Sequence, residues 1–267
     1  ILTNMNQPII TFLTDFGQQD GFVGTMKGVA LGINPGVSLV DITHDVPPQD
    51  VEEAAYLLRN AYSYFPDGTI HVVVVDPGVG TDRPGIIVET DRFRFVGPDN
   101  GVFSCVYQAS PRAKVTCIDN SEYCLPHVSH TFHGRDVFAP VAAHLSHGVQ
   151  TSACGPEVDN YVSGRISTAH VTRESIRGEA MHIDRFGNVV TNISEDQFFE
   201  STRGRSYRIE FEGMVIDRLS VTYADAAQGE MLAVIGSAGM LEISVNRGNA
   251  AQELGLVRRS PITVVMG

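Results

Sequence analysis

The first 150 residues alternate short apolar runs with segments in which apolar side chains recur every three or four positions. The runs are typical of buried strands and the spaced segments of amphipathic helices. The predicted strands cover residues 9–13, 37–42 and 69–75, and the predicted helices cover residues 22–33, 51–62 and 136–146. This β-α-β-α-β order predicts an α/β domain with a mostly parallel sheet and crossover helices.

The pattern changes after about residue 165. Residues 183–193 predict a hairpin that turns at residues 185–188, and no long helical period follows. Further short strands are expected at residues 207–211, 219–223, 231–235, 241–245 and 262–265. We therefore predict a smaller antiparallel β-barrel or sandwich domain. The expected domains are residues 1–165 and 175–267, with the boundary in the polar stretch 163–177.

Composition narrows the classes of partner. The chain has 267 residues, 43% of them hydrophobic, and a net charge of −12, so it can bury a core but does not suit nucleic acid or an anionic membrane. Its apolar runs are far shorter than the ~20 residues of a membrane span, and its first residues lack a signal-peptide pattern. The four cysteines, Cys105, Cys117, Cys124 and Cys154, form no C-x-x-C pair. Reduced thiols in a cytoplasmic protein are the prediction.

Polar residues follow the predicted strands at the ends where α/β sheets bind ligands. Asp15 ends the first strand and Asp76 the third, where a glycine-rich loop runs from Asp76 to Arg83. His133 stands at the start of a predicted helix. These four side chains are expected to converge on one crevice. The alternative is structural, because aspartate is also a common turn residue.

Other motifs are weaker. The G-x-G at residues 78–80 is too short for a dinucleotide fingerprint, and no phosphate-loop Gly-Lys-Ser/Thr follows it. Three histidines are spaced three apart, namely His127, His130 and His133. A proline before this run and a glycine after it disfavour a shared helical face, so we predict no metal site and no cofactor. His44 and His71 are expected to be structural.

Several motifs together resemble the S-adenosylmethionine (SAM) hydroxide adenosyltransferase family, which is related to SAM-dependent fluorinases and chlorinases. The matching segments, in chain order, are residues 14–17 with Asp20, 26–28, 50–54, 75–80, 97–101, 132–136, 183–192, 223–226 and 236–239. The resemblance spans essentially the whole chain. It implies an α/β N-domain, a β-barrel C-domain and a homotrimer in which the SAM site lies between the N-domain of one subunit and the C-domain of its neighbour.

The resemblance also implies roles for individual residues. Asp76, Arg83 and His133 match a triad around the attacking water, and Asp15 matches the acid that holds the ribose hydroxyls. The remaining matches are Phe186, Asn188 and Tyr223 around adenine, and Asp184 and Ser237 at the methionine ammonium and carboxylate. The implied reaction is hydrolysis of SAM to adenosine and methionine by in-line attack of water on the ribose 5′ carbon.

The chain departs from its halogenating relatives. Ala238 replaces an arginine near the methionine carboxylate, Gln49 and Val190 replace tryptophans, and Asp76 and His133 replace tyrosines. An ionised Asp76 about 4 Å from a halide would repel it by about 4 kcal/mol at an effective dielectric near 20. Hydrolysis is thus favoured over the alternatives, a SAM-dependent halogenase or a non-catalytic SAM- or adenosine-binding protein. A methyltransferase is disfavoured because no glycine-rich SAM loop follows the first strand.

Overall fold

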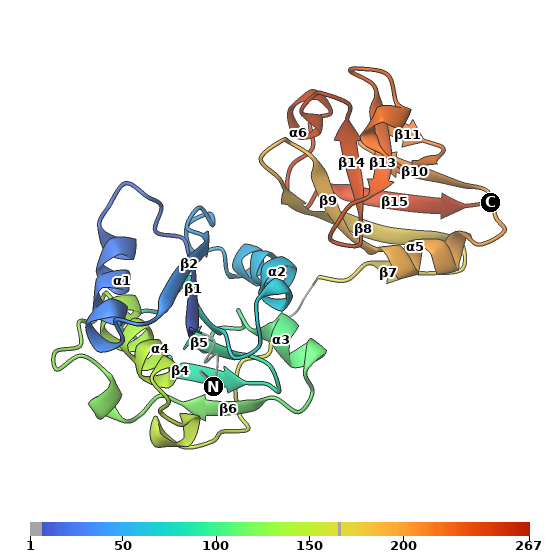
Figure 1. Cartoon of the computed structure of the whole chain (residues 1–267). Helices are drawn as coiled ribbons and strands as arrows, with labels where there is room; N and C mark the ends of the chain where they lie inside the picture. The colour runs from blue at the N-terminus through green and yellow to red at the C-terminus, as the bar shows by residue number, and fades with distance from the viewer. Residues whose placement is uncertain (1–6, 165–166) are drawn as a thin grey trace, which may run out of the picture. The chain divides into compact units, whose positions relative to one another are not determined.

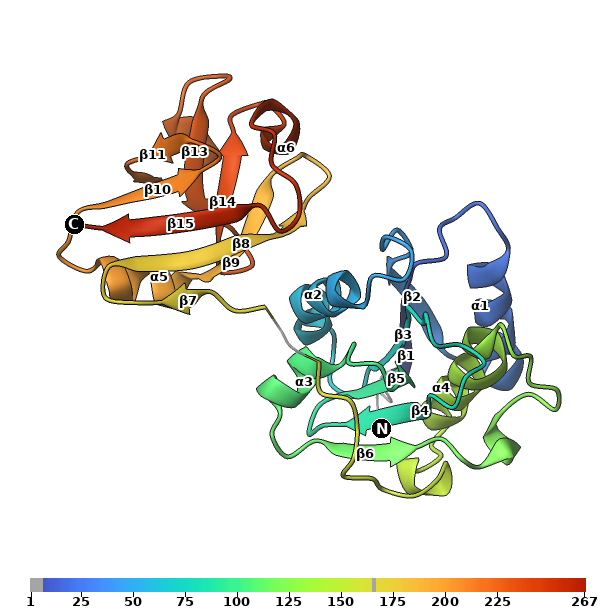
Figure 2. The ribbon, with the colours of Figure 1, turned by 180° about the vertical axis from the view of Figure 1, so that it is seen from behind.

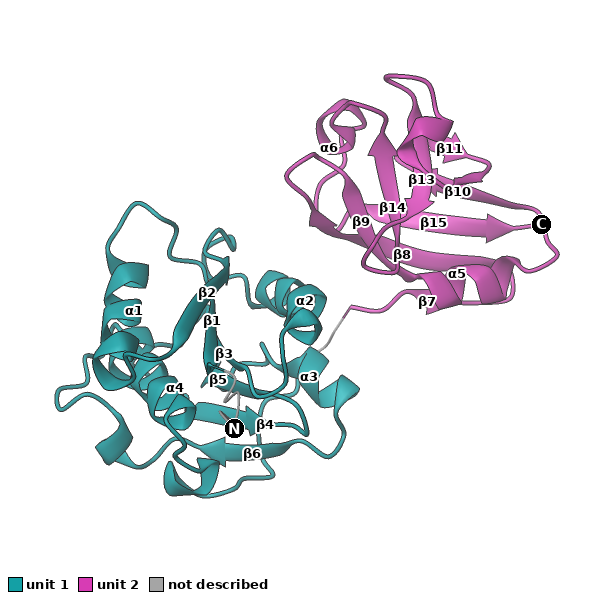
Figure 3. Cartoon of the chain, viewed as in Figure 1, with its two compact units in different colours: residues 1–166 teal, residues 167–267 magenta. Residues whose placement is uncertain are grey.

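The polar stretch near residue 165 separates two compact units. The structure is a computed structural model that describes residues 7–164 and 167–267, and the chain divides into residues 1–166 and 167–267 (Figure 3). Unit 1 is the α/β unit and unit 2 the β-rich unit, as the change of sequence pattern predicts. Within the described residues, no helix is both long and apolar enough to cross a membrane.

Unit 1 is built on a mixed, mostly parallel sheet. Its strands in the described residues are β1 (Ile9–Thr14), β2 (Ser38–Thr43), β3 (Ile70–Val74), β4 (Gly85–Glu89), β5 (Arg94–Pro98) and β6 (Lys114–Cys117). They are ordered β2-β1-β3-β5-β4-β6. The pairs β1–β2, β1–β3 and β3–β5 are parallel, whereas β4 is antiparallel to both of its neighbours. The parallel core confirms the predicted class; the β4–β5 hairpin was not predicted.

Helices cover both faces of this sheet (Figures 1 and 2). They are α1 (Phe22–Ile33), α2 (Val51–Ala61), α3 (Ser104–Ala109) and α4 (Ala139–Ser146), with a π turn at Gly134–Phe138 and short 3₁₀ turns at Tyr62–Tyr64, Ser121–Tyr123 and Thr151–Ala153. Alternate strand residues divide between the two faces, as the pleat requires. Phe12 packs in the core under α1 and α4, and Leu13 in the core under α2 and α3.

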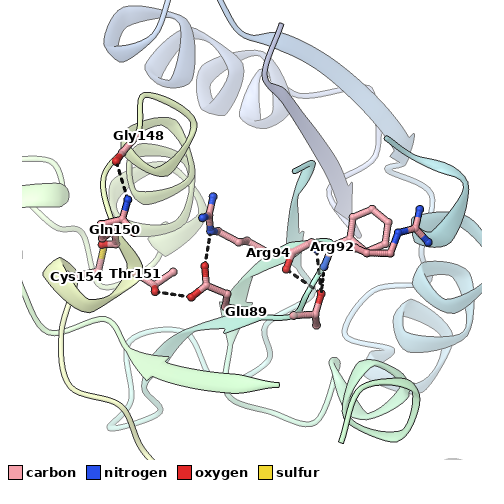
Figure 4. A network of polar contacts seen from close by, with 9 residues as sticks. Glu89, Arg92, Arg94, Gly148, Gln150, Thr151 and Cys154 are labelled. Carbon is pink, nitrogen blue, oxygen red and sulfur yellow. Dashed lines mark hydrogen bonds and ion pairs between the residues drawn. The ribbon is translucent and has the colours of Figure 1, made fainter. Parts of the chain in front are cut away.

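Local sequence signals set the ends of these elements. The side chain of Asp50 accepts the Glu53 N–H at 3.0 Å, which caps α2 where the sequence predicts its start. At the end of β4, the Glu89 carboxylate accepts from Arg94 on β5 and from Thr151, both at 2.8 Å (Figure 4). This network ties the β4–β5 hairpin to the segment after α4.

Unit 2 is a nearly closed, mainly antiparallel barrel. Its strands in the described residues are β7 (His170–Val171), β8 (Ser175–Ile183), β9 (Val189–Ser194), β10 (Tyr207–Phe211), β11 (Met214–Ile216), β12 (Leu219–Ser220), β13 (Met231–Ile235), β14 (Met240–Val245) and β15 (Pro261–Met266). The path is β11-β10-β15-β8-β9-β14-β13-β12, with β7 beside β8. Two short helices accompany it, α5 (Glu195–Thr202) and α6 (Ala250–Glu253).

Most strands of unit 2 lie where the sequence predicts them, including the β8–β9 hairpin. The strand expected over residues 219–223 is wrong beyond Ser220, because Thr222 caps a 3₁₀ turn, Tyr223–Asp225, by accepting the Ala224 N–H. In return the Asp225 side chain accepts the Thr222 N–H, which completes this capping box and turns the chain out of the sheet. Helix α5 was not predicted; its start is likewise a capping box, between Ser194 and Gln197.

Candidate functional site

Between β1 and β3 the sheet has a switch point, where strands that follow in sequence are added on the other side. From β1 it passes through α1 to β2, whereas β3 leads to the opposite side of the sheet. Ligands bind at the carboxyl ends of strands at such a switch point. Thr14 is the register partner of Val74, so β1 and β3 end at the same edge. Asp15 follows β1 directly and Asp76 follows β3 after Val75, which brings the two acids to one edge as the sequence predicts.

Asp15 is held by a residue distant in sequence rather than by its own turn. One carboxylate oxygen accepts the backbone N–H of Gln49 at 2.7 Å. Gln49 has φ +67°, a left-handed conformation that non-glycine residues adopt at some cost. Asp15 is half-buried, and its other oxygen makes no hydrogen bond to another described residue. This arrangement favours the functional interpretation over simple turn capping.

Asp76, Arg83 and His133 form one hydrogen-bonded trio. Nη2 of Arg83 donates to Asp76 Oδ2 at 2.6 Å and to His133 Nδ1 at 3.0 Å, while Nη1 donates to the Pro84 carbonyl at 2.7 Å. The side chains of Asp76 and Arg83 are only 5% and 9% exposed. Among the described residues, two buried atoms of the trio have no hydrogen-bond partner, Asp76 Oδ1 and Arg83 Nε.

The contacts fix the protonation of His133. A guanidinium can only donate, so Nδ1 of His133 must accept and the neutral ring carries its proton on Nε2. Burial and the neighbouring Arg83 both lower the pKa of His133, which favours this neutral form. Burial raises the pKa of Asp76 above its ordinary value of 3.8, although Arg83 opposes the shift. Asp76 is therefore a stronger base than an exposed aspartate.

Glycine allows the loop after β3 to approach His133. Gly80 has φ +77°, and a Cβ there would lie 2.2 Å from the His130 carbonyl oxygen. Any other residue would push the loop 76–83 away from the segment that carries His133. Asn100 holds the loop's start, because its side-chain amide donates to the Val75 carbonyl at 2.9 Å. These contacts give a structural reason for the glycine-rich pattern at residues 76–80.

His133 directly precedes the π turn, in which the Ala139 N–H bonds to the Gly134 carbonyl. In an α-helix, residues five apart differ by about 140° around the axis, whereas the wider turn of i→i+5 hydrogen bonding brings them closer to the same side. His133 and Phe138 are five apart, and both contact Arg83. The ring centre of Phe138 lies 5.5 Å from the guanidinium carbon. The π turn thus presents two side chains of one segment to the same guanidinium.

An aromatic cluster joins the Asp15 loop to the His133 segment. Phe16, next to Asp15, and Phe132, next to His133, have ring centroids 5.8 Å apart. Phe22, at the start of α1, contacts both rings, at 5.7 and 5.3 Å. The structure therefore brings all four residues predicted in the first domain to the same part of unit 1.

In unit 2, three predicted residues share the β8–β9 turn. Asp184 accepts the backbone N–H groups of Phe186 and Asn188, at 2.8 and 2.9 Å, and the Asn188 side-chain amide at 2.9 Å. Gly187 packs against Asn249, the N-cap of α6. The Phe186 ring is 76% exposed, whereas Asn188 is buried. The turn therefore displays an aromatic ring beside fixed polar groups.

The other two predicted residues of unit 2 lie on either side of β14. Tyr223 lies in the 3₁₀ turn, and its hydroxyl donates to Glu242 at 2.8 Å. Ser237 is exposed in the β13–β14 turn. Met240 at the start of β14 pairs with Ser194 at the end of β9, whereas the β8–β9 turn precedes the start of β9. Ser237 and that turn therefore lie at opposite ends of β14. Glu242 lies between them and was missed, because a single acid in a strand pattern indicates only a solvent-facing position.

The two histidines expected to be structural, His44 and His71, both make contacts within unit 1. His44 bonds through Nδ1 to Thr14 at 2.8 Å, and its Nε2 lies 2.9 Å from Asp41. His71 bonds Thr11 at 2.8 Å, stacks on Phe95, and has no partner for Nε2 among the described residues. Burial lowers the pKa of His71 to about 3, so it is neutral in the core. Within residues 7–164 and 167–267, no group of His, Cys, Asp or Glu is arranged to hold a metal ion.

Fold and site together define an α/β-plus-barrel protein with an acid–arginine–histidine trio at a sheet switch point. Residues 10–155 match the SAM hydroxide adenosyltransferase N-terminal domain, and residues 178–263 match the C-terminal domain. The chain belongs to the SAM hydroxide adenosyltransferase family.

Relatives of known activity support the same assignment over nearly the full length. The chain is 36% identical to an (R)-S-adenosyl-L-methionine hydrolase of Thermus thermophilus, covering 96% of this chain and 99% of the relative. It is 33% identical to the enzyme of that name in Methanocaldococcus jannaschii, over 96% and 95% of the two chains. A fluorinase of an Actinoplanes species is 26% identical, over 96% and 97%.

A solved structure shows the same fold. The crystal structure of an uncharacterized conserved protein from Thermotoga maritima superposes with a TM-score of 0.90 at 38% identity. The match covers 96% of this chain and 99% of that one. Both units therefore have a counterpart in one solved chain.

Proposed function

We propose that this protein hydrolyses SAM to adenosine and methionine, and that the trio of Asp76, Arg83 and His133 activates the water. The observation that carries the proposal is the pair of buried, unpartnered atoms in the trio. Asp76 Oδ1 is an acceptor and Arg83 Nε carries a donor proton. One atom accepts and the other donates, which are the two roles that a water molecule can satisfy, and buried polar groups of this kind bind ordered water.

The chemistry needs a base more than an acid. Water attacks the ribose 5′ carbon in line with the sulfonium, so a C–O bond forms and the C–S bond breaks. The C–S electron pair goes to sulfur, and methionine leaves as a neutral thioether that needs no proton. The proton lost from the water goes to Asp76, whose raised pKa suits it to accept. Arg83 stabilises the developing hydroxide character, and neutral His133 holds Arg83.

The remaining predicted residues bind the substrate in this proposal. Asp15 accepts from the ribose hydroxyls, and the exposed aromatic residues Phe186 and Tyr223, together with Asn188, contact the adenine. Asp184 and Ser237 hold the amino-acid part. Because the chain provides Ala238 where halogenating relatives have arginine, we expect a weaker grip on the methionine carboxylate than in those relatives.

The direct test is incubation with SAM, with and without chloride, followed by chromatography of the nucleosides. We expect equimolar adenosine and methionine in both cases. Appearance of 5′-chloro-5′-deoxyadenosine would instead assign a halogenase. Tight binding of SAM or adenosine without turnover would reject the hydrolase in favour of a binding protein.

We expect the rate to follow the ionisation of Asp76. The base must be deprotonated and His133 neutral, so kcat should rise with pH and then stay level, because a further rise in pH reverses neither condition. Since burial raises the pKa of Asp76, the midpoint of the acid limb should lie above the ordinary value of 3.8. Measurement of kcat from pH 4 to 9 at saturating SAM tests this. A rate that fell as the pH rose through neutrality would contradict it.

We further propose a homotrimer in which each active site combines the N-domain of one subunit with the C-domain of its neighbour. The candidate residues divide between units 1 and 2, so a complete site needs one group from each. Sizing by light scattering should give three chains, and specific activity should fall on dilution below the assembly constant. A fully active monomer would refute the shared site.

A further inference from the structure

Strand β14 has two differently composed faces. Leu241, Ile243 and Val245 point into the barrel core. Glu242 and Ser244 alternate with them and therefore lie on the outer side of the strand, where polar residues normally meet water. Here they are 6% and 0% exposed. A buried carboxylate on the outside of a barrel needs an explanation, since burying a charge is costly unless it is hydrogen-bonded or paired.

The partners of Glu242 in the described residues are two hydroxyls. Its Oε1 accepts from Tyr223 and from Ser244, each at 2.8 Å, and no described cation pairs with it. Gly236 leaves room for the carboxylate, because a Cβ there would lie 2.7 Å from Oε2. The site therefore accommodates a glutamate whose bonded oxygen lies toward Tyr223.

Tyr223 is a partly exposed residue with a bonded hydroxyl. The residue is 44% exposed, yet its hydroxyl is bonded to a buried acid. The turn that carries it is exposed from Val221 to Asp225 and is closed mainly by its own capping bonds. The hydroxyl bond to β14 is thus what fixes the ring direction, and a carboxylate acceptor makes such a bond strong.

We propose that Glu242 is a positioning residue that holds the ring of Tyr223 in place for stacking on the adenine of the substrate. This inference rests on the proposed function. Stacking depends on ring orientation, and a ring already ordered by Glu242 loses less freedom when the base binds. Glu242 itself does not touch the substrate; it acts only through the phenol.

The test uses Glu242→Ala, Tyr223→Phe and the double variant of the full-length protein. Each single change should weaken adenosine binding about tenfold, measured by titration calorimetry, and raise KM for SAM by the same factor with kcat unchanged. The double variant should be no worse than either single one, because both remove the same bond. Glu242→Gln keeps an acceptor and should recover most of the affinity.

Ser244→Ala is the matched control, because it removes the other hydroxyl on the same oxygen without touching Tyr223. It should bind adenosine like the wild type, and thermal unfolding should confirm that all variants are folded. Additive losses in the double variant, or wild-type affinity in Glu242→Ala, would overturn the positioning role while leaving the proposed function intact. A wild type that binds neither adenosine nor SAM would overturn both.

Discussion

Replacing Asp76 by asparagine should lower kcat by about 10²–10⁴-fold, the range that a general base contributes, with little change in the affinity for SAM. Asparagine keeps the shape and an acceptor oxygen but cannot take a proton at neutral pH. The affected atom is the unpartnered Oδ1, so the loss should fall on the chemical step. The measurement is adenosine release at saturating SAM, with SAM binding to the variant measured by calorimetry.

Asp99→Asn provides the matched control for this substitution. Asp99 is also a buried aspartate that follows a strand of the same sheet, but among the described residues its carboxylate accepts only the Val162 N–H, at 2.8 Å. We expect near wild-type turnover from Asp99→Asn. If Asp76→Asn also turned over SAM at the wild-type rate, Asp76 would not be the base.

Replacing Arg83 should have the second-largest effect. Lysine keeps the charge but cannot donate to Asp76, His133 and the Pro84 carbonyl from a planar fork, so Arg83→Lys should lose about 10²–10³-fold in kcat. Arg83→Met should lose more. Because the guanidinium lowers the pKa of Asp76, its removal should also move the acid limb of the kcat profile to higher pH.

The pH shift separates an electrostatic role for Arg83 from a purely structural one. Arg94→Met is the control, since Arg94 pairs with Glu89 at 2.8 Å at the start of β5, away from the carboxyl ends that carry the trio. It should alter neither kcat nor the position of the limb. If the acid limb of the kcat profile stayed at the same pH in Arg83→Met, Arg83 would not act on Asp76.

Much of the fold follows from local pattern. Apolar runs in β1 and β3 and the helical spacing of α1 place these elements correctly, because both sheet faces are covered and the strands need no polar side. The β4–β5 hairpin and α5 have weaker local signals. Tyr223 lies outside the strand predicted for it, because hydrogen bonds between Thr222 and Asp225 form a turn where β12 would otherwise continue.

The candidate site likewise combines features that the sequence predicts with contacts that arise only on folding. From the sequence we predict that Asp15 and Asp76 follow strands of a mostly parallel sheet, at the strand ends where such sheets bind ligands. The pattern allows more than one strand order, and the neighbouring positions of β1 and β3 are seen only in the folded structure. The contact of Arg83 with both Asp76 and His133 is visible only in the folded chain, since the Arg83–His133 bond spans 50 residues and depends on Gly80 and the π turn. The same holds for Glu242. Alternation fixes the face on which its side chain lies, but only packing of the Tyr223 turn over that face makes the glutamate a buried hydrogen-bond acceptor.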